Sequence, residues 1–164
     1  MRIAIIDLGT NTFNILIVET DASNAYKQIF QTKIAVKLGE GGITKGFIAP
    51  IPFQRGIDAL VQYKLVLDDY NVEKVFAFAT SAIRSASNGN EFVATAKQKA
   101  NIDIQVISGD KEAELIYYGV RSAVKMTNET SLIIDIGGGS TEFIIANKDQ
   151  VFWKQSFLLG AARL

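Results

Sequence analysis

The sequence predicts an α/β protein built on a mixed sheet, and three features of the chain support this fold class. Three strand-like segments separated by turns open the chain, which indicates antiparallel pairing. Strand and helix patterns then alternate, which favours parallel strands joined by helical crossovers. A second three-strand pattern follows residue 130. The expected element order is βββαβαβα, followed by the βββ start of a second, similar domain.

The first part of the chain predicts three strands and one long helix. The expected strands are residues 2–7, 13–20 and 26–36. A turn at residues 21–24 separates the last two, and residues 38–47, which contain four glycines, predict a loop. Pro50 or Pro52 suits the first turn of a helix that runs to about Tyr70.

The next part alternates strands with helices and then returns to strands. The expected strands are residues 75–79 and 104–107, and the expected helices are residues 89–100 and 110–124. Asn88 and Asp110 are predicted to cap these helices, because their side-chain oxygens can accept hydrogen bonds from free backbone amides. The three strands of the repeat are residues 131–135, 141–147 and 151–157.

The second three-strand unit ends where the first continues into its loop and helix. We therefore expect the chain to be a fragment of a longer protein. A meander without a covering helix leaves an apolar face open. The apolar side chains expected on one side of this meander or the other are Phe143, Ile145, Phe152, Trp153 and Phe157.

Composition limits the classes of function. The 164 residues include 17 basic and 17 acidic side chains, so no overall charge favours a nucleic acid or membrane partner. No Cys or His is present, which excludes disulfides and zinc–thiolate sites and leaves carboxylates to act as acids and bases. No apolar run is long enough for a membrane span, and the chain opens directly on a strand pattern. We expect a cytoplasmic protein.

Two similar glycine-containing turns carry the most informative chemistry. The stretch from Asp7 through its turn recurs 128 residues later, at Asp135, with aspartate and glycine in the same places. Glycine lets backbone amides approach an anion closely, and hydroxyl groups can donate to phosphoryl oxygens. The predicted phosphate-binding residues of the turns are Gly9, Thr10, Asn11, Thr12, Gly137, Gly138, Gly139 and Ser140.

A single turn of this composition is typical of an ordinary β-hairpin. Two copies within one chain instead favour two related half-sites that face each other. Such a pair would hold one phosphate chain from both sides.

Carboxylates beside these turns predict a magnesium site. Asp135 and Glu142 flank the second turn, whereas the first turn has Asp7 and, in place of the glutamate, Asn14. Oxygen ligands suit Mg²⁺, which keeps several waters and bridges to phosphate. We expect the metal mainly on Asp135 and Glu142, with Asp7 as a further candidate. The alternative is that the aspartates cap their own turns.

Four stretches, in this order, resemble the exopolyphosphatase and guanosine pentaphosphate phosphatase family. They are residues 7–14, 79–84, 107–117 and 134–142, and residues 159–164 are similar to the family's exit from the third strand of its second domain. The resemblance implies a ribonuclease H-like (actin-like) fold. Residues 1–127 would form its first domain, and residues 128–164 would begin the second.

The resemblance also implies two catalytic residues. Glu112, in the first turn of a helix, would activate the attacking water, and Arg84 would clamp phosphoryl oxygens and offset developing charge. Alternatively, Glu112 with Asp110 and Glu114 favours the helix dipole, and Arg84 is a solvent-exposed side chain at a helix start. The family commonly has an acid where this chain has Lys111, which would either lower the pKa of Glu112 or contact phosphate.

The predicted reaction is Mg²⁺-assisted attack of water that releases terminal phosphate from inorganic polyphosphate or guanosine pentaphosphate. Two alternatives stay open: an ATP-binding ATPase or kinase of the same superfold, and a non-catalytic phosphate or nucleotide sensor. We expect the full-length protein to be a homodimer.

Overall fold

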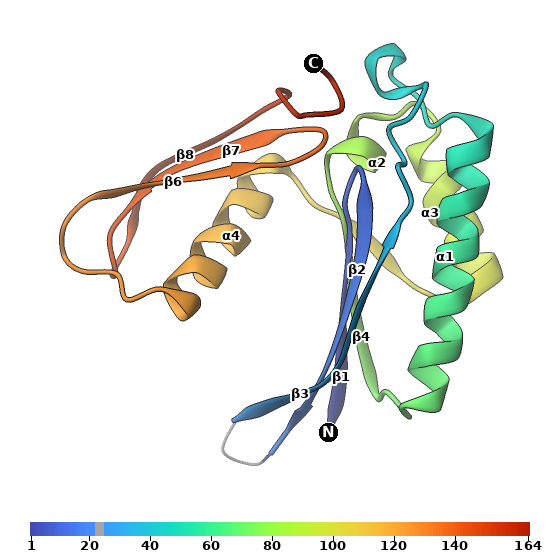
Figure 1. Cartoon of the computed structure of the whole chain (residues 1–164), viewed down its shortest axis with the longest axis horizontal. Helices are drawn as coiled ribbons and strands as arrows, with labels where there is room; N and C mark the ends of the chain where they lie inside the picture. Colours follow the sequence, from blue (N-terminus) through green and yellow to red (C-terminus); the bar gives the residue numbers. More distant parts are fainter. Residues whose placement is uncertain (22–24) are drawn as a thin grey trace.

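The computed structural model describes residues 1–21 and 25–164, and it contains two separate sheets (Figure 1). The first sheet has the strand order β3-β2-β1-β4-β5. Its strands are β1 (Arg2–Leu8), β2 (Thr12–Thr20), β3 (Tyr26–Ala35), β4 (Lys74–Ala79) and β5 (Ile104–Val106). Strands β1 to β3 pair antiparallel, whereas β4 is parallel to both β1 and β5, which confirms the mixed sheet. The turn predicted at residues 21–24 lies largely outside the described residues.

Two helices, α1 (Pro50–Asp69) and α3 (Gly89–Ala100), cover one face of this sheet, to the right of the strands in Figure 1. Phe92 of α3 is fully buried and packs edge-on against the rings of Phe13 and Phe53, with centroids 6.3 and 5.1 Å away. Alternate residues of β1 point into the same core, as strand periodicity requires. The opposite face of the sheet is therefore left for other elements and for ligands.

Two short helices were not predicted. The 3-10 helix η1 (Ile43–Lys45) lies within the expected loop, and α2 (Ser81–Ser85) follows β4 directly. Segments of three and five residues are too short to show a helical hydrophobic period. None of the described helices has both the length and the apolarity that a membrane-spanning helix needs.

Asn88 occupies the predicted N-cap position of α3 but makes no side-chain capping bond, and the predicted cap at Asp110 was wrong. The side chain of Asn88 instead holds the backbone of Ile48, accepting from its N–H at 2.8 Å and donating to its C=O at 2.9 Å. Helix α4 (Gly109–Ala123) is capped by Ser108, whose Oγ accepts from the N–H of Lys111 at 3.1 Å. Asp110 thus lies inside the first turn of α4, where a negative charge favours the helix dipole.

The second sheet repeats the opening of the first. It consists of β6 (Ser131–Ile136), β7 (Thr141–Ala146) and β8 (Val151–Phe157). Asp135 lies opposite Glu142 in the β6–β7 pair, just as Asp7 lies opposite Asn14 in the β1–β2 pair. The turn hydrogen bond from Gly9 N to Thr12 O, 3.1 Å, recurs from Gly137 N to Ser140 O, 2.9 Å. The internal repeat is therefore confirmed in strand register as well as in sequence.

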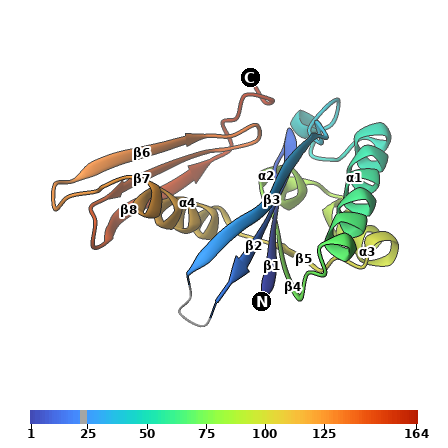
Figure 2. The same ribbon diagram turned by 60° about the horizontal axis from the view of Figure 1, so that its bottom comes forward.

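Helix α4 packs against one face of the second sheet, as both views show (Figures 1 and 2). Its Ala113 and Tyr117 meet Ile144 and Ala146, and Tyr117 Oη donates to Asn147 O at 3.0 Å. The expectation of an uncovered meander was thus wrong for this face, because α4 covers it. The predicted domain boundary between residues 127 and 128 was placed where the strand repeat begins. Helix α4 precedes this boundary but packs on the sheet that follows it.

The other face of the second sheet carries the apolar surface that the sequence led us to expect. Trp153 and Phe157 of β8 are exposed there, together with Ile134 and Ile136 of β6, which lies on the other side of β7. Phe152, also exposed, lies at the irregular register between β7 and β8.

Replacing Phe92 by Ala should destabilise the protein by about 3–5 kcal/mol, because it removes a fully buried ring and leaves a cavity among its neighbours. Urea unfolding followed by circular dichroism measures the change. As a matched control, Leu65→Ala on α1, where the side chain is 61% exposed, should change stability by less than about 0.5 kcal/mol. A loss below about 1 kcal/mol for Phe92→Ala would contradict the described core.

Candidate functional site

The two glycine-containing turns meet at their tips. A Cβ atom added to Gly138 would lie 2.7 Å from Asn11 Nδ2, and one added to Gly139 would lie 2.5 Å from Thr10 Oγ1. The turns can approach this closely only because these two positions lack side chains. The repeat predicted two half-sites that face each other, and the structure brings them into contact.

The last turn of the chain, residues 160–164, is hydrogen-bonded to the second glycine turn. Ala161 N donates to Gly137 O at 3.0 Å, and Ala162 N donates to Gly138 O at 2.8 Å. A Cβ atom on Gly160 would lie 2.3 Å from Gly138 O, so this position also requires glycine. These bonds engage the carbonyl groups of the turn and hold its backbone in one conformation.

Arg163 connects three segments around the turns. Its Nε donates to Gly139 O at 2.7 Å, its Nη2 to Ser85 Oγ at 2.9 Å and its Nη1 to Ile43 O at 3.3 Å. The guanidinium fork thus ties the second turn to α2 and to η1. Sequence reasoning missed this role, because nothing near Arg163 in the sequence marks the distant segments it contacts.

A cavity of about 490 Å³ lies between the first sheet, α4 and β6. Three of the predicted site residues line it: Asp7 at the end of β1, Glu112 in the first turn of α4 and Asp135 on β6. Apolar side chains of the first sheet and of α4, together with Ile107, form much of the remaining wall. The structure therefore gathers carboxylates from the two repeats and from the helix between them.

Arg84 lies next to Glu112 and is mostly buried. Its Nη1 donates to Glu112 Oε2 at 2.8 Å and to Ile107 O at 3.0 Å, and the two side chains are 21% and 15% exposed. Helix α2 places Arg84 directly after β4, so that it reaches the start of α4. The alternative of a solvent-exposed arginine is therefore wrong.

Two carboxylates of the site, Glu112 and Asp7, have a raised pKa. Burial is the main cause of the raised pKa of Glu112, with the charges of Glu142 and Asp7 adding to it and the hydrogen bond from Arg84 opposing it. Burial also raises the pKa of Asp7, to which Asp135 contributes by repulsion, while the hydrogen bond from Asn14 Nδ2, 3.1 Å, lowers it. Concentrated negative charge of this kind favours a bound cation.

Glu142 is positioned differently from the other carboxylates. It is 1% exposed, its Oε1 accepts from Ser156 Oγ at 2.7 Å, and it does not line the cavity. Over residues 1–21 and 25–164, no three or more acidic side chains are arranged to hold a metal ion. Asp7 and Asp135 remain as a pair facing the cavity, which fits Mg²⁺ because this ion usually takes one or two carboxylates and completes its shell with water and phosphate.

Lys111 points away from Glu112. Its Nζ lies 3.2 Å from Glu114 Oε1, and the pKa of Glu112 is raised rather than lowered. The expectation that Lys111 lowers this pKa is therefore wrong.

Ser81 is buried beside the second turn. Its side chain is 1% exposed, its Oγ makes no hydrogen bond within residues 1–21 and 25–164, and this atom lies 2.7 Å from where a Cβ of Gly139 would be. A buried hydroxyl without a partner is costly, and an anion held between the turns would satisfy it. This residue was not among those predicted from the sequence.

Solved structures and curated relatives match almost the whole chain. An exopolyphosphatase from Cytophaga hutchinsonii is 47% identical with a TM-score of 0.97, and the match covers 99% of this chain and 52% of that one. The bifunctional 3-dehydroquinate synthase/phosphatase of Fusobacterium nucleatum is 35% identical over 98% of this chain and 25% of its own length. The guanosine-5′-triphosphate,3′-diphosphate pyrophosphatase of Aeromonas hydrophila is 32% identical over 96% of this chain and 31% of its own length.

The chain thus spans about half the length of the solved exopolyphosphatase and less of the two curated relatives. A more distant structure, MreB5 of Spiroplasma citri, has 15% identity and a TM-score of 0.51, which supports the actin-like, ribonuclease H-like fold alone. The model of the Ppx/GppA phosphatase family matches residues 16–164. With this match over most of its length, the chain belongs to the Ppx/GppA phosphatase family.

Proposed function

We propose that the protein is a phosphoanhydride hydrolase that releases terminal phosphate from inorganic polyphosphate or guanosine pentaphosphate. The observation that carries this proposal is the Arg84–Glu112 pair, because Glu112 lines the same cavity as Asp7 and Asp135, the aspartates that precede the two turns. The family match and the relatives named exopolyphosphatase and pyrophosphatase support the reaction class.

Glu112 acts as the general base in this proposal. Its raised pKa makes it a stronger base than an ordinary glutamate, while the charge of Arg84 keeps its carboxylate form accessible. Both hydrogen bonds of the Arg84 side chain are donated by Nη1, and within the described part of the chain Nε and Nη2 donate none. These donors suit the oxygens of the phosphoryl group that is transferred.

The two turns bind the phosphate from opposite sides. The unpartnered hydroxyl of Ser81 and the hydroxyls of Thr10 and Ser140 are buried beside the turns, where donors are strongest because water is excluded. Preorganised donors of this kind need little rearrangement when negative charge develops during attack by water.

Asp7 and Asp135 would hold Mg²⁺ together with water and substrate oxygens. The ion would offset the charge of phosphate oxygens and polarise the bond that breaks. Glu142 lies opposite Asp135 but bonds to Ser156, so its predicted part in the ligand set stays a prediction. The cytoplasmic location, the homodimer and the absence of a nucleic-acid partner also stay predictions.

Glu112→Gln should lower kcat for phosphate release by about 10²–10⁴-fold in the full-length protein, because the amide cannot accept the proton of the attacking water. Colorimetric detection of released phosphate measures this rate, and circular dichroism checks that the fold is kept. The exposed Glu129→Gln variant serves as the control. A rate within about twofold of the unchanged protein would remove Glu112 from the role of base.

Arg84→Gln should move the acidic limb of the kcat/KM profile to higher pH. The hydrogen bond and the charge of Arg84 both lower the pKa of Glu112, so their loss raises it further. Since the deprotonated carboxylate is the active form, the variant needs a higher pH to reach its own maximum. Lys125→Gln, which removes an exposed cation, should leave the limb in place. A limb that stays or moves to lower pH contradicts the coupling.

Asp135→Asn should raise the Mg²⁺ concentration that gives half-maximal activity by about tenfold or more, because it removes one of two carboxylate ligands. The measurement is a magnesium titration of phosphate release. Asp149→Asn, in the exposed turn after β7, is the control and should titrate like the unchanged protein. An unchanged titration for Asp135→Asn would exclude this residue as a ligand.

A further inference from the structure

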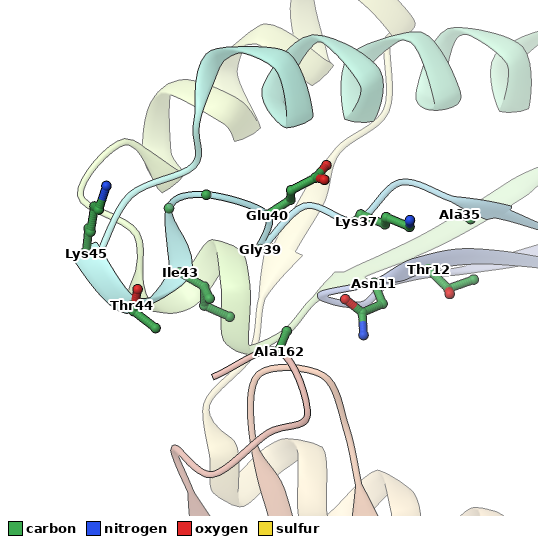
Figure 3. A pocket seen from close by; sticks show the side chains of 12 residues that line it. Asn11, Thr12, Ala35, Lys37, Gly39, Glu40, Ile43, Thr44, Lys45 and Ala162 are labelled. Atoms are coloured by element: carbon green, nitrogen blue, oxygen red, sulfur yellow. The ribbon is translucent and has the colours of Figure 1, made fainter. Parts of the chain in front are cut away.

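The last turn of the chain, residues 160–164, lies close to elements that come early in the sequence. Figure 3 shows Ala162 of this turn near Ile43 of η1 and Asn11 of the first glycine turn, and the three residues line one cavity. Arg163 follows Ala162 and donates to Ile43 O at 3.3 Å, a contact between residues 120 positions apart. The last turn therefore joins the part of the chain that follows β8 to the part that precedes α1.

Helix α2 is the second segment that Arg163 contacts. Arg163 Nη2 donates to Ser85 Oγ at 2.9 Å, and Ser85 Oγ donates in turn to Ser81 O at 2.8 Å. Because the Ser85 hydrogen is directed to Ser81 O, a lone pair of the same oxygen can accept from Arg163. Arg84 directly precedes Ser85. Arg163 thus holds the end of the short helix that presents Arg84 to Glu112.

Helix α2 is too short to fix the position of Arg84 by itself. It has five residues, and a helix of this length is unstable without contacts to its neighbours. Residues 81–83 are buried, whereas Arg84 and Ser85 at the end of the helix are only partly buried. The bond from Arg163 therefore lies where burial holds the helix least.

The third contact of Arg163 is with the second glycine turn. Its Nε donates to Gly139 O at 2.7 Å, and a Cβ added to Gly139 would lie 2.7 Å from Ser81 Oγ. One guanidinium thus contacts both of these neighbouring segments. Nε and Nη2 lie on one edge of a planar, rigid group, so their two bonds fix the acceptors Gly139 O and Ser85 Oγ relative to each other.

We propose that Arg163 is a positioning residue, which holds the second glycine turn and Arg84 in the relative position that the transition state of phosphate release requires. The inference rests on the proposed function. Amides of this turn and the Nε and Nη2 donors of Arg84 would stabilise charge on the same phosphoryl group, and such donors are effective when they are preorganised. All three nitrogens of the Arg163 guanidinium donate to protein oxygens, so its part is to hold other groups in place.

The test compares four variants with the unchanged full-length protein. They are Arg163→Gln, Arg163→Lys, Ser85→Ala and the double variant Arg163→Gln with Ser85→Ala. Arg121→Gln is the matched control, because it removes an exposed arginine from the last turn of α4. The kcat and KM of phosphate release are measured below the unfolding temperature of each variant, with inorganic polyphosphate and with guanosine pentaphosphate.

Arg163→Gln should lower kcat about 10²-fold and change KM less than about threefold, because misplaced donors weaken transition-state binding more than substrate binding. Arg163→Lys should have a similarly low kcat, since one ammonium cannot make the bonds of a guanidinium fork. Arg121→Gln should match the unchanged protein. A lower unfolding temperature with unchanged kcat would indicate a role in stability alone and overturn the proposal. Full recovery of kcat by lysine would also overturn it, because charge alone would then suffice.

The double variant tests whether Arg163 acts through α2. Ser85→Ala removes the hydroxyl that joins Arg163 to the helix, so it should lower kcat about tenfold and add little in the presence of Arg163→Gln. If the two losses multiply in the double variant, Arg163 and α2 act independently and the proposal is wrong. An unchanged kcat for Ser85→Ala has the same consequence.

Hydrogen exchange, measured by mass spectrometry, tests the contacts of Arg163 separately from the reaction. Arg163→Gln should speed exchange in residues 81–86 and 137–141, which lose a shared anchor, and leave residues 57–67 of α1 unchanged. Unchanged exchange in the first two segments would overturn the proposal even if kcat fell. If the unchanged protein released no phosphate from either substrate, the proposed hydrolase function would fail. The exchange comparison would still decide whether Arg163 holds the turn and α2 together.

Discussion

The contact between the two glycine turns is the constraint on which the rest of the site depends. Gly138 and Gly139 touch Thr10 and Asn11 at distances that leave no space for a side chain. This contact brings the ends of β1 and β6 together. It therefore helps to set the distance between Asp7 and Asp135, the equivalent aspartates of the two repeats. Arg163 and the backbone bonds of the last turn fix the second turn from its other side.

The charges of the site explain why it suits phosphate chemistry. They also explain why the site without a ligand lowers the stability of the fold. Asp7, Glu112 and Asp135 line one partly apolar cavity, where desolvation and the charges of neighbouring carboxylates raise the pKa of Asp7 and of Glu112. Arg84 offsets part of this cost through its bond to Glu112. A cation and a phosphate group would bring compensating charge and hydrogen-bond partners, including an acceptor for the buried hydroxyl of Ser81. The site is thus better satisfied with a ligand than without one.

The predicted and observed folds agree where the pattern is long and local. Strands such as β1 and β2 were expected from their apolar pattern, and the 20-residue helix α1 from its apolar period together with the prolines at its start. The prediction failed for α2 and η1, which are too short to show a period, for the cap at Asp110, and for the side-chain capping bond of Asn88, which does occupy the N-cap position. Capping depends on which backbone groups lie within reach, and tertiary contacts with Ile48 drew the Asn88 side chain elsewhere.

The sequence by itself determined the repeat, the strand pattern and the kinds of residue that the site contains, because each of these is written in local order and spacing. Tertiary structure alone decided which side chains meet. It paired Arg84 with Glu112, placed Glu142 against Ser156 and used Arg163 to join three distant segments. These contacts join residues up to 120 positions apart, and only the packing of β-sheets and helices brings such distant positions within hydrogen-bond distance.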